Sequence, residues 1–217
     1  MQPILIIAVL LFSVVVHEVA HAWQARREGD DTADKLGRIT LNPIPHLDFM
    51  GSLVVPLILH FSGSGFLFGW AKPVPVNPSK YRSPVWGDIR VSMAGIVSNF
   101  ILAALATLAA AVVVKTASIV GSVGPVTGVL LQMADYGIVI NLILAFFNLV
   151  PIPPLDGSHV VAHMLPRSLA IRYQEAGRYG LPILMGLFFL VPGFFQYILW
   201  PVTYLRGMAD LFIRLWI

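Results

Sequence analysis

The first apolar run of the chain, residues 3–23, contains two histidines and a glutamate near its end, in the sequence HEVAH. About 20 apolar residues cross the hydrocarbon core of a bilayer as a helix, so this run predicts a transmembrane span. On a helix, His17 and His21 lie four residues apart and share one face, with Glu18 beside them. Ionisable side chains inside a membrane are costly without partners, so a shared role for these three is expected.

Composition places the whole chain among membrane proteins. Of its 217 residues, 57% are hydrophobic and 12% are charged, whereas a soluble domain carries about 25% charged residues. The chain has no cysteine, which excludes disulfides and thiolate ligands and leaves His, Asp and Glu to bind a metal. The net charge of +3 comes from basic residues gathered in a few loops. That pattern orients spans and gives no reason to expect a nucleic-acid partner.

The apolar runs predict an all-α polytopic membrane protein with about four to five transmembrane helices, in a single domain over residues 1–217. Further spans are expected at residues 88–114 and 127–150, a fourth beginning near Gly180, and an amphipathic interfacial tail from about Tyr204. Basic residues cluster after the first span, so the positive-inside rule places that loop in the cytoplasm and the N-terminus outside. We expect a multi-pass protein of the plasma or inner membrane.

Two segments between the first and second spans are unlike simple crossings. Residues 51–61 are apolar but about half a span long, and Pro56 interrupts them, which predicts a re-entrant or interfacial segment. Residues 69–78, GWAKPVPVNP, contain three prolines. Proline cannot donate to a sheet ladder, so this stretch predicts an edge strand or small β-hairpin, and a rigid interface loop remains an alternative.

A catalytic zinc site needs a third protein ligand and one open position. HEVAH lies a few helical turns before the first cytoplasmic arginine, Arg26, so the metal is expected in the cytoplasmic half of the bilayer. Asp156 is the carboxylate of the third-span region that reaches this depth, after a proline-broken segment suited to line a cavity. A helix-end cap is the alternative role for Asp156, and His159 is an alternative ligand. Glu18 is then placed to act as general base.

The paired motifs HEVAH and NLVPIPPLDG resemble the site-2 protease family of intramembrane zinc metalloproteases. Within it, the chain is similar to the short prokaryotic branch without PDZ or CBS domains. The segments GRITLNPIPHLD, FGWAKPVPVNP and AGIVSN support the resemblance, which covers residues 17 to about 160. It implies one zinc ion per chain held by His17, His21 and Asp156. Glu18 matches the family's catalytic glutamate, and Asn148 an asparagine near its active centre.

The resemblance further implies an edge strand beside the site that binds an unwound substrate. The matching substrate-binding positions are Trp70, Lys72, Val74, Val76 and Asn77. The residues expected to contact or orient the ligands are Asn99, which is equally a packing candidate, Gly157 and His159. The implied activity is hydrolysis of peptide bonds within or near transmembrane segments, in regulated intramembrane proteolysis.

Transmembrane proteins are the expected substrates and the lipid bilayer the surroundings, and no oligomeric state is predicted. Two rival functions use the same residues differently. A metal-binding membrane transporter would need the histidines without needing Glu18 as a base. A catalytically silent membrane adaptor would need neither the metal nor the base.

Overall fold

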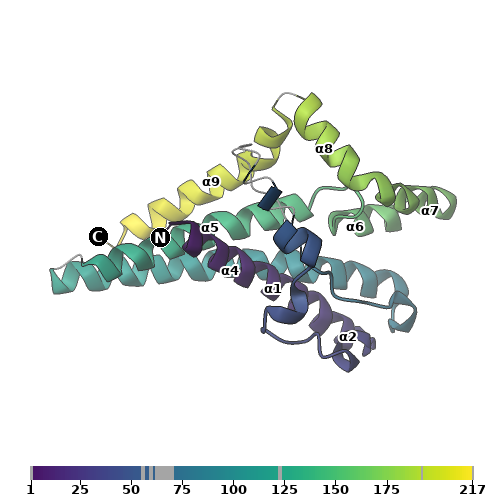
Figure 1. The fold of residues 1–217 in the computed structure, drawn as a ribbon, viewed down its shortest axis with the longest axis horizontal. Helices are drawn as coiled ribbons and strands as arrows, with labels where there is room; N and C mark the ends of the chain where they lie inside the picture. Colours follow the sequence, from purple (N-terminus) through teal and green to yellow (C-terminus); the bar gives the residue numbers. More distant parts are fainter. Residues whose placement is uncertain are drawn as a thin grey trace.

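The computed structural model describes residues 2–54, 57–58, 61, 71–121, 124–191 and 193–216. Within these residues the chain is mostly helical and contains no β-strand. Among the described helices, three are long and apolar enough to cross a membrane: α1 (Gln2–Glu28), α4 (Pro84–Val120) and α5 (Pro125–Asn148). They pack against one another along the long axis of the molecule (Figure 1).

Local sequence explains where α4 and α5 begin and end. Each begins with a proline, which fits the first turn of a helix because its missing N–H has no partner there. Gly121 has φ of 65°, a left-handed conformation that ends α4 and turns the chain toward α5. The resulting hairpin extends beyond both termini of the chain (Figure 1).

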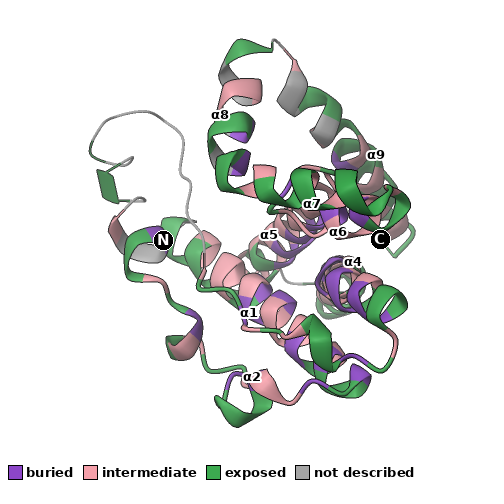
Figure 2. Ribbon diagram, turned by 90° about the vertical axis from the view of Figure 1, so that its right-hand side faces the viewer, coloured by how far each residue is buried: buried purple, intermediate pink, exposed green. Residues whose placement is uncertain are grey.

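Close helix packing produces the core. A Cβ on Gly137 of α5 would lie 2.9 Å from the Cβ of Ala106 on α4, so the two backbones approach through a small residue. Figure 2 shows buried residues concentrated where α1, α4 and α5 meet. This three-helix contact carries most of the candidate site.

In the described residues, the C-terminal part of the chain forms four further α-helices and a 3-10 turn (Ala176–Tyr179). The α-helices are α6 (Gly157–Met164), α7 (Arg167–Glu175), α8 (Gly180–Leu190) and α9 (Phe194–Arg214). The span expected to begin near Gly180 is therefore interrupted: α8 has 11 residues and is about 16 Å long. The chain then turns sharply, and α9 returns along α5 (Figure 1).

The tail predicted from about Tyr204 is amphipathic, as expected, but it is part of α9, which continues through this position and packs onto the bundle. Its interfacial placement stays a prediction. The apolar side chains of α9 recur every three or four residues and join the core cluster of α4 and α5. These side chains are Leu199, Val202, Leu205, Ala209 and Ile213.

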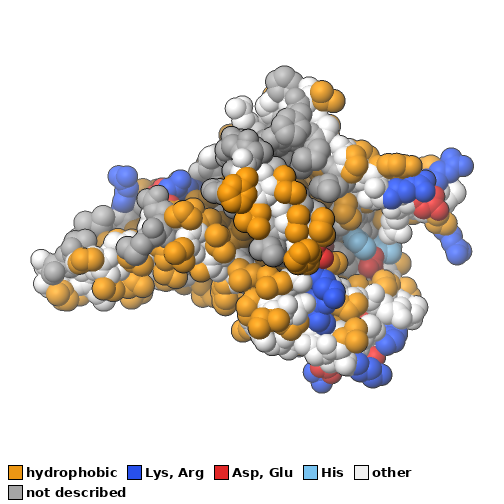
Figure 3. Space-filling view, in the orientation of Figure 1, with side chains coloured by type: hydrophobic (Ala, Val, Ile, Leu, Met, Phe, Trp, Pro, Cys, Tyr) orange, Lys and Arg blue, Asp and Glu red, His pale blue; other side chains and the backbone are white. Residues whose placement is uncertain are grey.

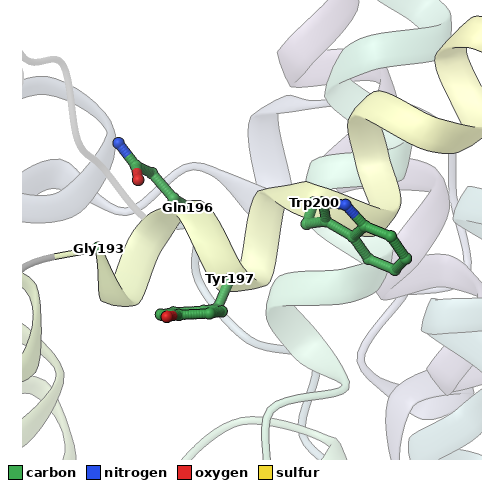
Figure 4. Close-up of a pocket in the computed structure, with 4 residues that line it drawn as sticks. All are labelled: Gly193, Gln196, Tyr197 and Trp200. Atoms are coloured by element: carbon green, nitrogen blue, oxygen red, sulfur yellow. The ribbon is translucent and has the colours of Figure 1, made fainter.

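The start of α9 borders an open pocket. It has a volume of about 750 Å³ and is lined by Gly193, Gln196, Tyr197 and Trp200 (Figure 4). Figure 4 shows Gln196 and Tyr197 projecting from opposite sides of that helix.

Short elements occupy the connection between α1 and α4. They are α2 (Thr32–Lys35), two 3-10 turns (Ile44–His46 and Pro78–Lys80) and a π-helical turn (Phe49–Val54). The predicted re-entrant segment stays a prediction, because residues 55–56 and 59–60 lie outside the described residues. On the face shown in Figure 3, most Lys and Arg side chains gather at the end of the molecule that carries α2 and α7.

Candidate metal centre

Three side chains predicted as metal ligands converge on one point. His17 and His21 come from consecutive turns of α1, and Asp156 directly precedes α6. The Nε2 atoms of His17 and His21 are 3.0 Å apart, and the Oδ2 atom of Asp156 lies 3.2 Å from His17 Nε2 and 3.3 Å from His21 Nε2. The structure thus brings together two imidazoles and one carboxylate.

The opposite ring nitrogen of each histidine is anchored. His21 Nδ1 lies 2.7 Å from the carbonyl oxygen of Val91. A carbonyl only accepts, so Nδ1 carries the proton and the Nε2 lone pair faces the cluster. His17 Nδ1 lies 2.6 Å from Asn99 Oδ1 and is oriented in the same way.

The cluster fits a zinc ion on three grounds. Asp156 Oδ2 is buried and makes no hydrogen bond. The three facing atoms all carry lone pairs, and a shared metal cation removes the cost of burying them together. Ligands about 2.0–2.1 Å from a tetrahedral ion are about 3.3 Å apart, close to the spacing observed here, and zinc accepts this set of nitrogen and oxygen donors.

Gly95 of α4 forms the wall of the site. A Cβ at this position would come within 2.4 Å of His21 Nε2 and 2.7 Å of His17 Nε2. The small residues around Gly95 are typical of close helix packing, and here that packing brings α4 next to the two histidines. The backbone of α4 approaches both imidazoles with no side chain between them.

The turn between α5 and α6 brings Asp156 to the histidines. Gly157 begins α6, and a Cβ there would lie 2.3 Å from the carbonyl oxygen of Leu149. Only glycine allows this fold-back. Asn148, the last residue of α5, donates from Nδ2 to the carbonyl oxygen of Leu144, 3.0 Å away on its own helix.

Glu18 faces segment 71–77, which forms no regular secondary structure. Its Oε2 atom accepts a hydrogen bond from the backbone N–H of Val74 at 2.7 Å. The structure thus places part of the predicted substrate-binding stretch against the predicted general base. The β-hairpin itself stays a prediction: residues 71–77 have no ladder partner among the described residues, and Trp70 lies outside them.

Two further backbone N–H groups hold segment 71–77 in place, and Arg38 Nη2 donates to the carbonyl oxygen of Lys72 at 2.9 Å. The N–H of Lys72 donates to the carbonyl oxygen of His46 at 2.9 Å, and the N–H of Asn77 donates to Asp30 Oδ2 at 2.6 Å. Burial by itself would raise the pKa of Asp30. Hydrogen bonds from Thr32 and from the Asn77 amide, with the Lys80 charge, outweigh burial and lower that pKa below its ordinary value. The carboxylate therefore stays ionised and keeps its hold on the segment.

His159 does not join His17, His21 and Asp156 but contacts a different residue, Asp88. Its Nδ1 atom lies 3.0 Å from Asp88 Oδ2, and His163 Nε2 lies 2.8 Å from the same oxygen. Among the remaining predicted substrate positions, the Val76 side chain is exposed.

Two residues that the sequence analysis did not single out join Asn99 inside the bundle. Ser13 and Asn141 are 0% and 3% exposed, and Asn141 bonds to both Asn99 and Ser13. Each is a polar residue within an apolar span, which is the signal that should have identified them.

Comparison with known proteins agrees with the geometry. The model of peptidase family M50 matches residues 117–191. The chain is 38% identical over 202 residues to the "Putative zinc metalloprotease YwhC" of Bacillus subtilis (strain 168), covering 93% of this chain and 86% of that protein. It is 37% identical over 107 residues to the "Putative zinc metalloprotease Rip2" of Mycolicibacterium smegmatis (strain ATCC 700084 / mc(2)155), covering 47% of this chain and 38% of that protein.

No solved structure matches the chain. The Bacillus relative, however, is matched over most of both chains, and both relatives are named as zinc metalloproteases. The chain therefore belongs to peptidase family M50, the site-2 protease family of zinc metalloproteases.

Proposed function

We propose that this metalloprotease is an intramembrane endopeptidase that cleaves peptide bonds within or near transmembrane segments of other membrane proteins. The observation that carries the proposal is the convergence of His17, His21 and Asp156 inside the bundle of apolar helices. A metal centre on a membrane-crossing helix reaches bonds that a soluble protease cannot reach. Such an enzyme would serve regulated intramembrane proteolysis.

His17, His21 and Asp156 would hold the zinc ion, which supplies Lewis-acid activation of a water molecule and of the scissile carbonyl. Glu18 takes the proton from the attacking water and passes it to the leaving amine. Asn148, at the end of α5, stabilises the developing oxyanion or holds the substrate backbone through its side-chain amide. Gly157 has no side chain, and this allows the tight turn that brings Asp156 to the histidines.

The substrate would bind along residues 70–77 as an unwound strand. A transmembrane helix satisfies its own backbone hydrogen bonds, so it must open before an amide bond can be attacked. An extended segment beside the site offers the freed groups new partners. The contact between Val74 and Glu18 supports this assignment, because it joins the segment to the proposed base. Side chains of Trp70, Lys72 and Val76 would then meet the substrate.

The proposed topology has the N-terminus outside and the zinc in the cytoplasmic half of the bilayer. The basic pair Arg26 and Arg27 at the end of α1 supports that orientation. We assign a fourth crossing to α8 and α9 together, and lateral entry of the substrate to the side of the protein flanked by residues 51–77 and the C-terminal region. The chain then acts as one domain in the plasma or inner membrane.

The test combines zinc content with cleavage of a single-span reporter protein in nanodiscs. Wild type should hold about one zinc per chain, and His17→Ala should lose both zinc and cleavage. Glu18→Gln should keep zinc and lose cleavage by about 10²-fold or more, the usual contribution of a general base. Glu28→Gln is the matched control, because this second glutamate of α1 pairs with Arg90 instead. Cleavage at the wild-type rate by Glu18→Gln would refute the mechanism.

The same variants separate the rival functions. A transporter would keep moving metal ions after Glu18→Gln, and an adaptor would keep its activity after His17→Ala. Either result without cleavage of any membrane-protein reporter would replace the protease proposal.

A further inference from the structure

A continuous chain of buried polar side chains leads from the metal centre into the middle of the helical bundle. His17 Nδ1 lies 2.6 Å from Asn99 Oδ1, and Asn99 Nδ2 donates to Asn141 Oδ1 at 2.8 Å. Asn141 Nδ2 in turn donates to Ser13 Oγ at 2.9 Å. The chain passes from α1 through α4 and α5 and returns to α1, where Ser13 stands one turn before His17.

Two backbone carbonyls determine the direction of every hydrogen bond in this chain. Asn141 Nδ2 also donates to the carbonyl oxygen of Gly137 at 2.8 Å, and Ser13 Oγ donates to that of Val9 at 2.8 Å. Carbonyl oxygens only accept. The amide nitrogen of Asn141 must therefore face Gly137, which leaves its Oδ1 atom to accept from the neighbouring asparagine.

The same logic continues to the histidine. Because Asn99 donates to Asn141, its own oxygen faces His17, and His17 Nδ1 must be the donor in the 2.6 Å contact. The proton of the imidazole is thereby held at Nδ1, and the lone pair of Nε2 is directed at the ligand cluster. His21 reaches the same state more simply, through the single carbonyl of Val91.

We propose that Asn99, Asn141 and Ser13 are positioning residues that hold His17 in its metal-binding tautomer and ring orientation. The inference rests on the proposed role of His17 as a zinc ligand. These three residues are at most 3% exposed. Polar groups at such depth in a membrane protein are costly unless they serve a function. Here each one fixes the orientation of the next, and the last fixes a ligand.

A purely structural role would look different. Hydrogen bonds that only hold helices together need no fixed direction and need not end on a ligand. If Asn99 acts only by joining α4 to α5, its bond to Asn141 matters and its bond to His17 does not. If Asn99 acts as proposed, the acceptor that it offers to His17 matters most.

The test measures zinc affinity of the full-length chain in nanodiscs, by competition with a chromogenic chelator. Asn99→Leu, which removes the acceptor, should weaken zinc binding about 10- to 100-fold, the usual effect of losing a hydrogen-bond partner of a ligand. Ser13→Ala, two links farther away, should weaken it about threefold, because only part of the effect is transmitted along a hydrogen-bond chain. Thr107→Ala removes a comparable back-bonding hydroxyl from α4, away from the chain, and should leave the affinity unchanged.

Asn99→Asp supplies the rescue that separates the two roles. It keeps an acceptor for His17 but has no donor for Asn141. Its zinc affinity should stay within about threefold of wild type, because a carboxylate is a common partner of a zinc-bound histidine. In this background Ser13→Ala should have no further effect, since a carboxylate needs no neighbour to fix its direction. The d–d spectrum of the Co²⁺-loaded protein should shift in Asn99→Leu and match wild type in Thr107→Ala.

The possible failures are distinguishable. Wild-type zinc affinity in Asn99→Leu, within about twofold, would overturn the inference if His17→Ala has lost zinc. If Asn99→Asp binds zinc as weakly as Asn99→Leu, the inference is also overturned, and the role of Asn99 is to join α4 to α5. If His17→Ala itself keeps zinc, the proposed function fails. If Asn99→Leu does not fold, as judged by thermal unfolding, Ser13→Ala against Thr107→Ala decides the question.

Discussion

Two clusters in this fold are built from the same parts, two histidines four residues apart on one helix and an aspartate from another element. They are His17, His21 and Asp156 at the candidate metal centre, and His159, His163 and Asp88 between α6 and α4. In the part of the chain that the structure describes, the first is the single group of such side chains arranged to hold a metal ion.

The two clusters differ in the direction of the N–H groups of their histidines, which point away from the aspartate in the first cluster and toward it in the second. At the metal centre, the anchors on Nδ1 turn the Nε2 lone pairs toward each other, and Asp156 Oδ2 makes no hydrogen bond. In the second cluster, Asp88 Oδ2 accepts from both His159 and His163, so its need for partners is met. Residue types alone therefore do not identify a metal site, and the direction of the hydrogen bonds does.

Exposure sharpens the contrast. The side chains of His17 and His21 are 9% and 12% exposed, whereas those of His159 and His163 are 39% and 25% exposed. Unsatisfied lone pairs are costly in the drier cluster, and a cation removes that cost. The wetter cluster acts as a hydrogen-bonded contact between two helices.

The largest expected effect is on zinc content. Asp156→Ala should reduce bound zinc from about one ion per chain to near zero, because two histidines alone do not complete a site. Asp88→Ala should leave zinc content unchanged. Elemental analysis after gel filtration measures both. Loss of zinc in Asp88→Ala would show that the two clusters are not distinct in function.

A smaller effect is expected from filling the wall of the first cluster. Gly95→Ala places a methyl group 2.4 Å from His21 Nε2, and the overpacking should cost about 1–3 kcal/mol in zinc binding. Chelator competition measures this loss. Gly128→Ala is the control, because a Cβ there meets nothing within 4 Å. Equal zinc affinities in the two variants would contradict a tightly packed wall.

The second cluster should affect stability rather than metal binding. Asp88→Asn weakens the contact of α4 with α6 and should lower the free energy of unfolding by about 1 kcal/mol, a modest value because both histidines are partly exposed. Thermal unfolding of the zinc-loaded protein measures it. Unfolding of Asp88→Asn at the wild-type temperature would show that the contact does not stabilise the fold.

The smallest effect is a pH dependence confined to α6. The hydrogen bond to Asp88 raises the pKa of His159 above its ordinary value of 6.5. A raised pKa in the folded state means that the stabilisation is complete below pH 6.5 and is lost as pH rises through the raised value. Hydrogen exchange, corrected for its intrinsic pH dependence, should show less protection of α6 across that range. His159→Gln should abolish this pH dependence of protection. If the pH dependence persists in that variant, it comes from a group other than His159.

The long helices could be predicted because a membrane allows the backbone few ways to satisfy its hydrogen bonds. Apolar length alone therefore indicated α1, α4 and α5. The packing of α9 onto α5 could not be predicted in this way, because it depends on contacts between distant segments. For the part after Tyr204, amphipathic spacing does not tell whether the apolar face meets lipid or another helix.

At the site, spacing was informative where one helix holds the residues, as with His17 and His21. Asp156 could be predicted as the third member from its depth and its broken backbone. The contact of Val74 with Glu18 could not be, since it brings together residues 56 positions apart. Ser13 and Asn141 were visible as polar residues in apolar runs, but their hydrogen-bond order required coordinates.

The backbone of segment 71–77 has a consequence for any peptide laid beside it. Three of its amide hydrogens are already directed to His46, Glu18 and Asp30, and Pro73 and Pro75 have none to offer. Within the described chain, Ala71 and Val76 carry the two N–H groups of the segment that have no hydrogen-bond partner. Arg38 Nη2 already donates to the carbonyl oxygen of Lys72 at 2.9 Å, but the segment still presents more oxygen acceptors than N–H donors. A bound peptide must supply the donors itself, so a proline at a pairing position would forfeit a bond that this protein cannot replace.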